Sequence, residues 1–169
     1  MKKNLVLLGM MAVGKSTIAR IVAKKLKIKF IDIDSIIQKN NSLTIAEIFE
    51  RKGEKFFRRE EEKEVLRHLK KDNSIIALGG GAFINKTIRK NILKTAKSLW
   101  MDLDIDIIND RVKNNNKRPL LKKENNRDKL IQLYNKRRKI YELADHKIKC
   151  DKLSKIEIAK RIIEIYEKY

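Results

Sequence analysis

The chain has 169 residues, 42% of them hydrophobic, and a net charge of +20 that comes from 42 lysines and arginines against 22 aspartates and glutamates. This length is enough to bury the core of one domain, and we expect residues 1–169 to form a single one. No stretch reaches the roughly 18 apolar positions that a membrane-spanning helix needs. The lone cysteine, Cys150, excludes a disulfide within the chain and fits the reducing cytoplasm, where we expect the protein to reside.

A balance this basic has two interpretations. The charge attracts nucleic acid, anionic membranes or phosphate-rich ligands, or it reflects lysines dispersed over a solvated surface. No basic tail or block of like charge stands out, which favours the second interpretation. We therefore expect neither a nucleic-acid nor a membrane partner.

The first elements surround a glycine-rich loop. The apolar run 5–8 predicts a buried strand, and apolar residues at helical spacing predict a helix over 16–26. Between them, "GMMAVGKST" fits G-x-x-x-x-G-K-[ST] at Gly9, Gly14, Lys15 and Ser16. In such a loop, backbone N–H groups turn inward onto phosphate oxygens, and the following helix adds its positive amino end. The lysine reaches the β and γ phosphates and the serine coordinates Mg²⁺, so the sequence predicts a nucleotide phosphate site.

Two aspartates follow the next strand, which is expected over 28–33. "FIDID" places Asp32 and Asp34 at its end. Side chains alternate in an extended chain, so both carboxylates would project to the same side. One could assist a metal or accept a proton while the other accepts hydrogen bonds from hydroxyls. The alternative is a pair of solvated aspartates that cap the next helix; beside a phosphate loop, we favour the functional interpretation.

A charged segment comes next. Thr44 forms a capping box with the glutamate three residues on and begins a helix that ends at Gly53. A second helix is expected over about 54–70. Arg58 lies near its start, where by itself it fits an exposed charged face with i, i+4 ion pairs such as Arg58–Glu62.

Three consecutive glycines, at 79–81, lie near the middle of the chain. A strand is expected over 74–78, and the glycines at 79–81 stop it before a helix near Asn85. A tight turn rarely needs three glycines, whereas glycines let a backbone approach a ligand closely. We therefore expect this loop to bind part of a ligand.

A polar stretch separates the next elements. A strand is expected over 97–103 and a helix over 105–112. Segment 113–126 has no apolar periodicity and contains the only proline, Pro119, so we interpret it as a mobile loop. Arg118 in this loop could close over a nucleotide and stabilise the transferring phosphoryl group, or it could be an incidental surface arginine.

The last elements are two helices around a short strand. A helix over about 127–144 carries Arg137 and Arg138, either of which could fork onto a carboxylate or contribute only surface charge. A strand is expected at 146–149, and Ser154 opens the terminal helix with a second capping box. We expect the inner face of that helix to carry Ile156, Ala159, Ile162, Ile163 and Tyr166.

Strands therefore alternate with helices from end to end. This order predicts an α/β fold in which a parallel sheet is covered by helices on both sides. Such sheets bind ligands at the carboxyl ends of their strands. The phosphate loop, the two aspartates and the three glycines all fall at such ends, so we expect one site there.

The ordered motifs together resemble the shikimate kinase family. They are the phosphate loop, D-x-D, G-E-x-x-F-R-x-x-E, G-G-G, R-P-L and R-x-x-x-Y, which run from Gly9 to about Ala144. The resemblance implies a three-layer αβα P-loop kinase fold with a five-stranded parallel sheet in the order 2-3-1-4-5. It also implies transfer of the γ-phosphoryl of ATP to the 3-hydroxyl of shikimate, with Mg²⁺, in aromatic amino acid biosynthesis. A substrate-binding helical segment would span about 34–62, and a lid loop about 113–126.

The same resemblance assigns residues to the nucleotide. The residues that would wrap the ATP phosphates are Ala12, Val13, Gly14, Lys15, Ser16 and Thr17. Ser16 would hold Mg²⁺, and Asp32 would support its water shell. Arg118 would reach the ATP phosphates, and Arg111 would lie against the adenine. Ala12 departs from the family, which usually has glycine there.

On the acceptor side, the resemblance implies that Asp34 grips the shikimate hydroxyls and orients the attacking one. Arg58 and Arg137 would clamp the carboxylate, and Gly80 would offer its backbone to the ring hydroxyls. Lys139 stands where the family usually has proline, so Arg138 is the alternative to Arg137. The catalytic residues would be Lys15, Asp34 and Arg118.

Two rival functions also fit parts of the sequence. Gluconate also offers a carboxylate and hydroxyls, so a gluconate kinase or another small-molecule kinase of the same fold is the nearest alternative. A nucleic-acid-associated ATPase would predict a basic stripe interleaved with exposed aromatics, but aromatics make up only 6% of the chain. The expected partners are therefore ATP and shikimate, bound by a monomer.

Overall fold

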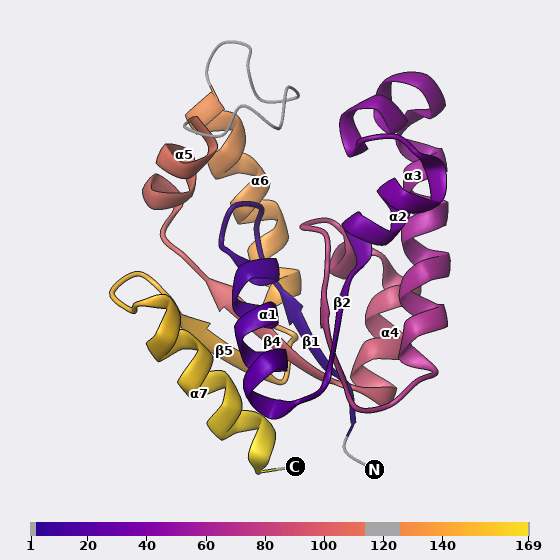
Figure 1. The fold of residues 1–169 in the computed structure, drawn as a ribbon. Coiled ribbons are helices and arrows are strands. Elements are labelled where there is room, and N and C mark those ends of the chain that lie inside the picture. The colour runs from indigo at the N-terminus through magenta and orange to yellow at the C-terminus, as the bar shows by residue number, and fades with distance from the viewer. Residues whose placement is uncertain (1–2, 114–125, 169) are drawn as a thin grey trace.

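A single parallel sheet organises the fold. A computed structural model of the chain describes residues 3–113 and 126–168. Its strands are β1 (Leu5–Leu8), β2 (Lys29–Asp32), β3 (Ser74–Ala77), β4 (Lys97–Asp102) and β5 (His146–Lys149), and they lie in the order β2-β3-β1-β4-β5 (Figure 1). Every pairing is parallel, which confirms the expected sheet and strand order. Most of the expected lid loop, including Arg118, lies outside the described residues.

Helices cover both faces of the sheet. They are α1 (Lys15–Leu26), α2 (Ile33–Asn41), α3 (Ile45–Leu69), α4 (Lys86–Thr95), α5 (Ile105–Lys113), α6 (Asn126–Tyr141) and α7 (Lys155–Glu167), with a short 3-10 turn η1 (Ala82–Ile84). Helices α1 and α7 lie on one face and α4 on the other, so the expected three layers are confirmed (Figure 1). Helices α2–α3 and α5–α6 rise on either side of the carboxyl end of β1.

The central strands are apolar because both of their sides are covered. All four residues of β1 and all four of β3 are buried, as expected for a parallel sheet between helical layers. Strand β5 lies at an edge and alternates exposed lysines with buried Ile148. Lysines on an edge strand discourage pairing with another chain.

One boundary differs from the sequence prediction and affects the site. Strand β2 ends at Asp32, not at residue 33, and α2 begins at once. Asp32 is the N-cap of α2, and its Oδ1 accepts a hydrogen bond from the Ser35 N–H at 3.1 Å. Asp34 therefore lies in the first turn of a helix, so its direction is set by helical geometry and not by strand alternation.

The predicted helix starts are confirmed. Thr44 and Ser154 each form a complete capping box, with Glu47 and Glu157 respectively. Gly53 breaks the helical geometry inside α3 with φ 81° and ψ 164°, a conformation open to glycine and costly for other residues. The chain thus runs as two helical pieces on either side of Gly53, as the sequence predicts.

Two expectations near the carboxyl end are wrong. Ile156 is 67% exposed, and Ile158 takes the inward position together with Ala159, Ile162 and Tyr166. Ile156 lies in the first turn of α7, on a side that faces solvent. Helix α6 ends at Tyr141, three residues before the expected end.

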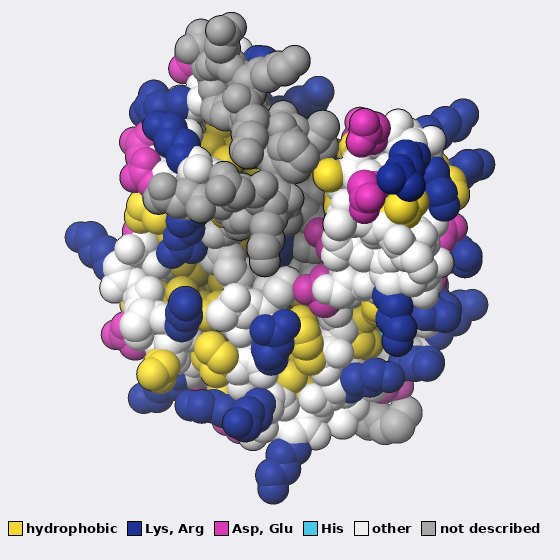
Figure 2. Space-filling model, turned by 45° about the horizontal axis from the view of Figure 1, so that its top comes forward, with side chains coloured by type: hydrophobic (Ala, Val, Ile, Leu, Met, Phe, Trp, Pro, Cys, Tyr) yellow, Lys and Arg dark blue, Asp and Glu magenta, His cyan; other side chains and the backbone are white. Residues whose placement is uncertain are grey.

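Cationic side chains are scattered over the surface. On the face in Figure 2, lysines and arginines stand among apolar, acidic and neutral side chains and do not form one continuous stripe. Among the described residues, none of the helices is both long and apolar enough to cross a bilayer.

A buried amide holds the amino ends of the central strands together. Asn4 is fully buried, and its Oδ1 accepts hydrogen bonds from the Ser74 N–H at 3.0 Å and the Ser74 hydroxyl at 2.7 Å. Its Nδ2 donates to the Lys71 carbonyl. These bonds fix the start of β3 beside β1, at the end of the sheet opposite the expected site.

Asn4→Ala should therefore destabilise the fold. The change leaves the buried Ser74 N–H without its acceptor, and an unsatisfied buried donor costs about 1–3 kcal/mol. Asn135→Ala, at an exposed position on α6, should change stability by less than about 0.5 kcal/mol. Urea unfolding monitored by circular dichroism measures both, and equal stabilities for the two variants would contradict this role of Asn4.

Candidate functional site

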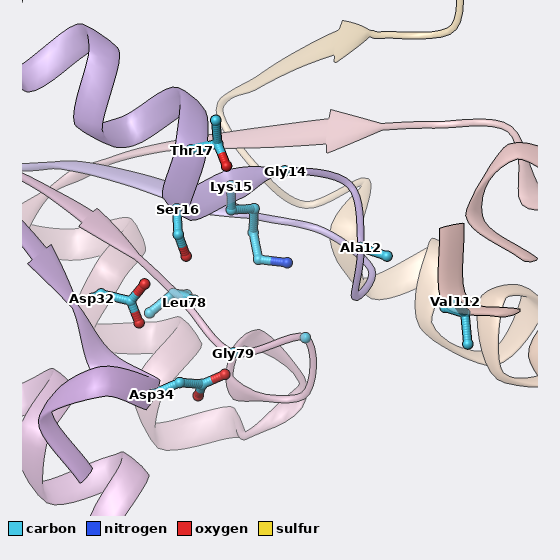
Figure 3. A pocket seen from close by; sticks show the side chains of 11 residues that line it. Ala12, Gly14, Lys15, Ser16, Thr17, Asp32, Asp34, Leu78, Gly79 and Val112 are labelled. Atoms are coloured by element: carbon cyan, nitrogen blue, oxygen red, sulfur yellow. The ribbon is translucent and has the colours of Figure 1, made fainter. Parts of the chain in front are cut away.

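One cavity opens at the carboxyl ends of β1, β2 and β3. It measures about 270 Å³, and its lining residues are Ala12, Gly14, Lys15, Ser16, Thr17, Asp32, Asp34, Leu78, Gly79, Gly80 and Val112 (Figure 3). These residues come from the phosphate loop and the start of α1, from the end of β2 and the start of α2, from the glycine loop and from α5, so segments far apart in the sequence meet here. The predicted phosphate loop, the two aspartates and the triple glycine are brought together as expected.

The phosphate loop encloses a buried cation. Lys15 is 8% exposed, and its Nζ donates to the carbonyl oxygens of Gly9 at 2.9 Å and Met10 at 2.7 Å. Gly14 caps α1 in a left-handed conformation, and no side chain bonds to the first amides of that helix from the cap position. The amino end of α1 and the ammonium together make this end of the cavity electropositive.

The other loop residues take two positions. Val13 is buried in the core, so only its backbone can face a ligand, whereas Ser16 and Thr17 line the cavity. Ala12 has φ 61°, a left-handed conformation that costs a residue with a Cβ roughly 1–2 kcal/mol. The usual family glycine would avoid that cost. Arg111 on α5 donates from Nη1 to the Ala12 carbonyl at 3.1 Å and so contacts the loop from outside.

Oxygen ligands suited to a hard cation face each other across the cavity. The Ser16 hydroxyl and the Asp32 carboxylate both point into it (Figure 3). Among the described residues there is no group of three or more His, Cys, Asp or Glu side chains that could hold a metal ion by themselves. A hydroxyl and a carboxylate are oxygen ligands of the kind that Mg²⁺ uses together with substrate phosphates and water.

The opposite end of the cavity carries a compact cluster of charges around the triple glycine. A Cβ on Gly79 would lie 2.7 Å from Glu61 Oε1 and 2.8 Å from Asp34 Oδ1. A Cβ on Gly81 would lie 2.6 Å from Arg58 Nη1. A side chain at Gly79 or Gly81 would therefore have to displace a carboxylate or the Arg58 guanidinium.

The Arg58 guanidinium is held by two glutamates on its own helix. Its Nη1 donates to Glu61 Oε2 at 2.7 Å, and its Nε and Nη2 donate to Glu54 Oε1 at 3.2 Å. The pair suggested by the sequence, Arg58–Glu62, is thus replaced by partners at i−4 and i+3. The i+3 glutamate is the last residue of the G-E-x-x-F-R-x-x-E motif, so its spacing from the arginine was the signal for this contact.

Glu61 is the most deeply buried charge of the cluster, at 1% exposure. Burial raises the pKa of Glu61 and the nearby Asp34 adds to the rise, while Arg58 and Arg137 oppose it. Burial alone would lower the pKa of Arg58, but its ion pairs with Glu61 and Glu54 outweigh burial and raise it. Arg58 is therefore a fixed cation at the edge of the site.

The structure distinguishes the two arginines of α6. A Cβ on Gly80 would lie 3.3 Å from Arg137 Nη1, so this side chain lies against the glycine loop. Arg138 points to solvent, where its Nε pairs with Glu142 at 3.0 Å. Despite the missing proline at Lys139, Arg137 is the arginine that joins the cluster.

Sequence reasoning missed one further contact with the loop. The Tyr141 hydroxyl donates to the Gly80 carbonyl. This tyrosine ends the R-x-x-x-Y motif, but nothing in the local sequence indicates a partner 61 positions away.

Comparisons with known proteins agree with this geometry. The family model "Shikimate kinase" matches residues 11–167. A shikimate kinase from Rhizobium leguminosarum bv. trifolii is 43% identical over 122 residues, which is 72% of this chain but only 62% of the relative's own length. A shikimate kinase from Bartonella henselae is 37% identical over 167 residues, covering 99% of this chain and 80% of that one.

Solved structures give the same result. The shikimate kinase from Acinetobacter baumannii, in complex with shikimate, superposes with a TM-score of 0.93 at 28% identity and covers 99% of this chain and 94% of its own. A gluconokinase from Sinorhizobium meliloti reaches a TM-score of 0.58 at 12% identity, with 99% and 93% of the two chains covered, which shows a shared fold alone. The family model spans nearly all of the chain, and on that ground the chain belongs to the shikimate kinase family.

Proposed function

We propose that the chain transfers the γ-phosphoryl group of ATP to the 3-hydroxyl of shikimate. The observation that carries this proposal is the pairing of two sites across one cavity. A phosphate loop with a buried lysine lies at one end, and Asp34 lies at the other beside Arg58 and Arg137. A small ring with one carboxylate and several hydroxyls needs cations at one end and an acceptor carboxylate at the other.

On the nucleotide side, the loop amides and the amino end of α1 would bind the ATP phosphates. Lys15 would donate to the β and γ phosphates in place of part of its bonding to the Gly9 and Met10 carbonyls. Ser16 and Asp32 would hold Mg²⁺, which supplies neutralisation of the developing phosphate charge. Arg111 already lies beside the loop and is proposed to contact the base, while Arg118 is proposed to reach the phosphates.

On the acceptor side, Asp34 would accept a hydrogen bond from the attacking hydroxyl and orient it toward the phosphate loop. Arg58 and Arg137 would bind the carboxylate, and the Gly80 backbone would meet a ring hydroxyl. Phosphoryl transfer depends mainly on positioning and charge stabilisation, so a nucleophile on the protein is not required. A monomer in the cytoplasm that binds no nucleic acid stays a prediction.

The proposal predicts a selective acceptor. In a coupled assay that follows ATP turnover with Mg²⁺, we expect turnover with shikimate and none above background with gluconate or a nucleoside monophosphate. Among the described residues, the cavity lining offers no aromatic side chain on which a base could stack. Open-chain gluconate does not hold its carboxylate and hydroxyls at the fixed spacing that a ring gives between Arg58, Arg137 and Asp34. Equal turnover with gluconate would contradict the proposal that shikimate is the specific acceptor.

The two arginines of α6 provide a matched pair of variants. Arg137→Ala should lower kcat/KM for shikimate by an amount equivalent to about 2–5 kcal/mol, because a carboxylate would lose a partly buried partner. Arg138→Ala removes the same kind of side chain from a solvent-exposed ion pair and should leave kcat/KM within about twofold. Steady-state kinetics with varied shikimate compare them, and similar losses in both variants would refute the assignment of Arg137.

Glu61→Gln should change how stability depends on pH. Burial raises the pKa of Glu61, so at intermediate pH the folded chain binds a proton that the unfolded chain has released. Protonation of Glu61 therefore stabilises the folded chain as pH falls through the pKa that Glu61 has in the folded state. This stabilisation is lost as pH rises through that pKa.

Urea unfolding from about pH 8 down to about pH 4, close to the ordinary glutamate pKa, tests this linkage. The wild type should gain stability relative to the glutamine variant as pH falls, whatever the offset between them. Subtracting the free energy of unfolding of the variant from that of the wild type cancels the contributions of the other carboxylates, because they titrate in both proteins. A stability difference that stays constant over this range would show that Glu61 keeps an ordinary pKa.

A further inference from the structure

The glycine loop has fixed carbonyls and available amides. The Gly79 carbonyl accepts from the Ala82 N–H at 3.2 Å, and the Gly81 carbonyl accepts from the Ile84 N–H at 3.1 Å. The Gly80 carbonyl accepts from the Tyr141 hydroxyl. Within the described residues, the amides of Gly80 and Gly81 donate to no other group. The three carbonyl groups of the loop are thus bonded within the protein, and the amides of Gly80 and Gly81 are available to donate to a ligand.

The hydroxyl of Tyr141 reaches this loop from a distant part of the sequence. Its side chain is fully buried, with its ring centroid 5.8 Å from that of Trp100. Burial raises the pKa of Tyr141, so the hydroxyl keeps its proton and acts as a donor. Its oxygen also lies 3.8 Å from Met10 Sδ, beside the phosphate loop.

Tyr141 and Arg137 lie one turn apart on α6. Residues at i and i+4 share a helix face, and both side chains reach the same glycine. A Cβ on Gly80 would lie 3.3 Å from Arg137 Nη1 and 3.3 Å from the Met11 nitrogen. Gly80 is therefore enclosed between α6 and the start of the phosphate loop.

We propose that Tyr141 is a positioning residue for the phosphate acceptor. Its hydroxyl fixes the Gly80–Gly81 peptide, so that the loop amides face the cavity and keep their distance from Arg137 and from the phosphate loop. This inference rests on the proposed function for the identity of the acceptor. The hydrogen bond from the Tyr141 hydroxyl to the Gly80 carbonyl does not depend on which acceptor is bound.

Tyr141→Phe tests the proposal because it removes the hydroxyl and keeps the ring beside Trp100. We expect the KM for shikimate to rise about tenfold, the size of effect that follows loss of one buried hydrogen bond. The KM for ATP should stay within about twofold, since the phosphate loop keeps its own bonds.

Tyr134→Phe is the matched control. Tyr134 lies two turns earlier on α6, and its hydroxyl donates to Asp102 Oδ1 at 2.8 Å, away from the glycine loop. This variant loses the same group from the same helix, so it reports a general loosening of α6. It should raise neither KM by more than about twofold.

A second readout needs no catalysis. The chain has only six glycines, so labelling with ¹⁵N-glycine gives a simple amide spectrum. The Gly81 amide shares its peptide group with the Gly80 carbonyl, and its resonance should move in Tyr141→Phe but not in Tyr134→Phe. Adding shikimate to the wild type should shift the Gly80 and Gly81 signals more than the other four.

The outcomes separate the two proposals. An unmoved Gly81 resonance, equal rises in both KM values, or the same kinetics in both tyrosine variants would overturn the positioning role. If Tyr141→Phe does not fold, the wild-type titration decides, since unshifted Gly80 and Gly81 signals in a protein that turns over shikimate also overturn it. A wild type that fails to phosphorylate shikimate refutes the proposed function, while the Gly81 resonance still tests the bond to Tyr141.

Discussion

The pairing of β1 with β3 is the constraint on which the site depends. Leu7 lies opposite Ala77, and the Leu78 N–H donates to the Leu7 carbonyl at 3.1 Å just where both strands end. The phosphate loop leaves β1 and the glycine loop leaves β3, so two segments about 70 positions apart must emerge side by side. Parallel strands put both carboxyl ends at one edge. The phosphate loop and the glycine loop are adjacent because the two buried strands that they leave are adjacent.

Charge is then arranged around that edge so that almost none of it is buried alone. Lys15 lies among carbonyl oxygens, and Glu61 shares its burial with Arg58. A buried ion pair adds little stability by itself, and breaking it by removing one partner is costly. The ion pair is therefore better understood as a means of holding Arg58 in one orientation than as a source of stability.

The sequence predicted features that are encoded locally. The phosphate loop, both capping boxes and the break at Gly53 each depend on a few neighbouring residues, and all are found. The start of α2 was missed because isoleucines on either side of Asp32 resemble a strand, whereas the Asp32 side chain caps a helix. Ile156 was placed inside because apolar spacing cannot show where a helix extends beyond its core.

Contacts that join distant segments were not predictable in this way. The choice between Arg137 and Arg138 depends on the rotation of α6 about its axis. That rotation places the Tyr141 hydroxyl on Gly80 and the Tyr134 hydroxyl on Asp102, two contacts that span 61 and 32 positions. The phosphate loop can be recognised from nine consecutive residues, whereas the charged cluster that α2, α3, the glycine loop and α6 form can be recognised only once the fold is known. Residue spacing alone therefore specifies the phosphate-loop half of the cavity better than the half that carries the charged cluster.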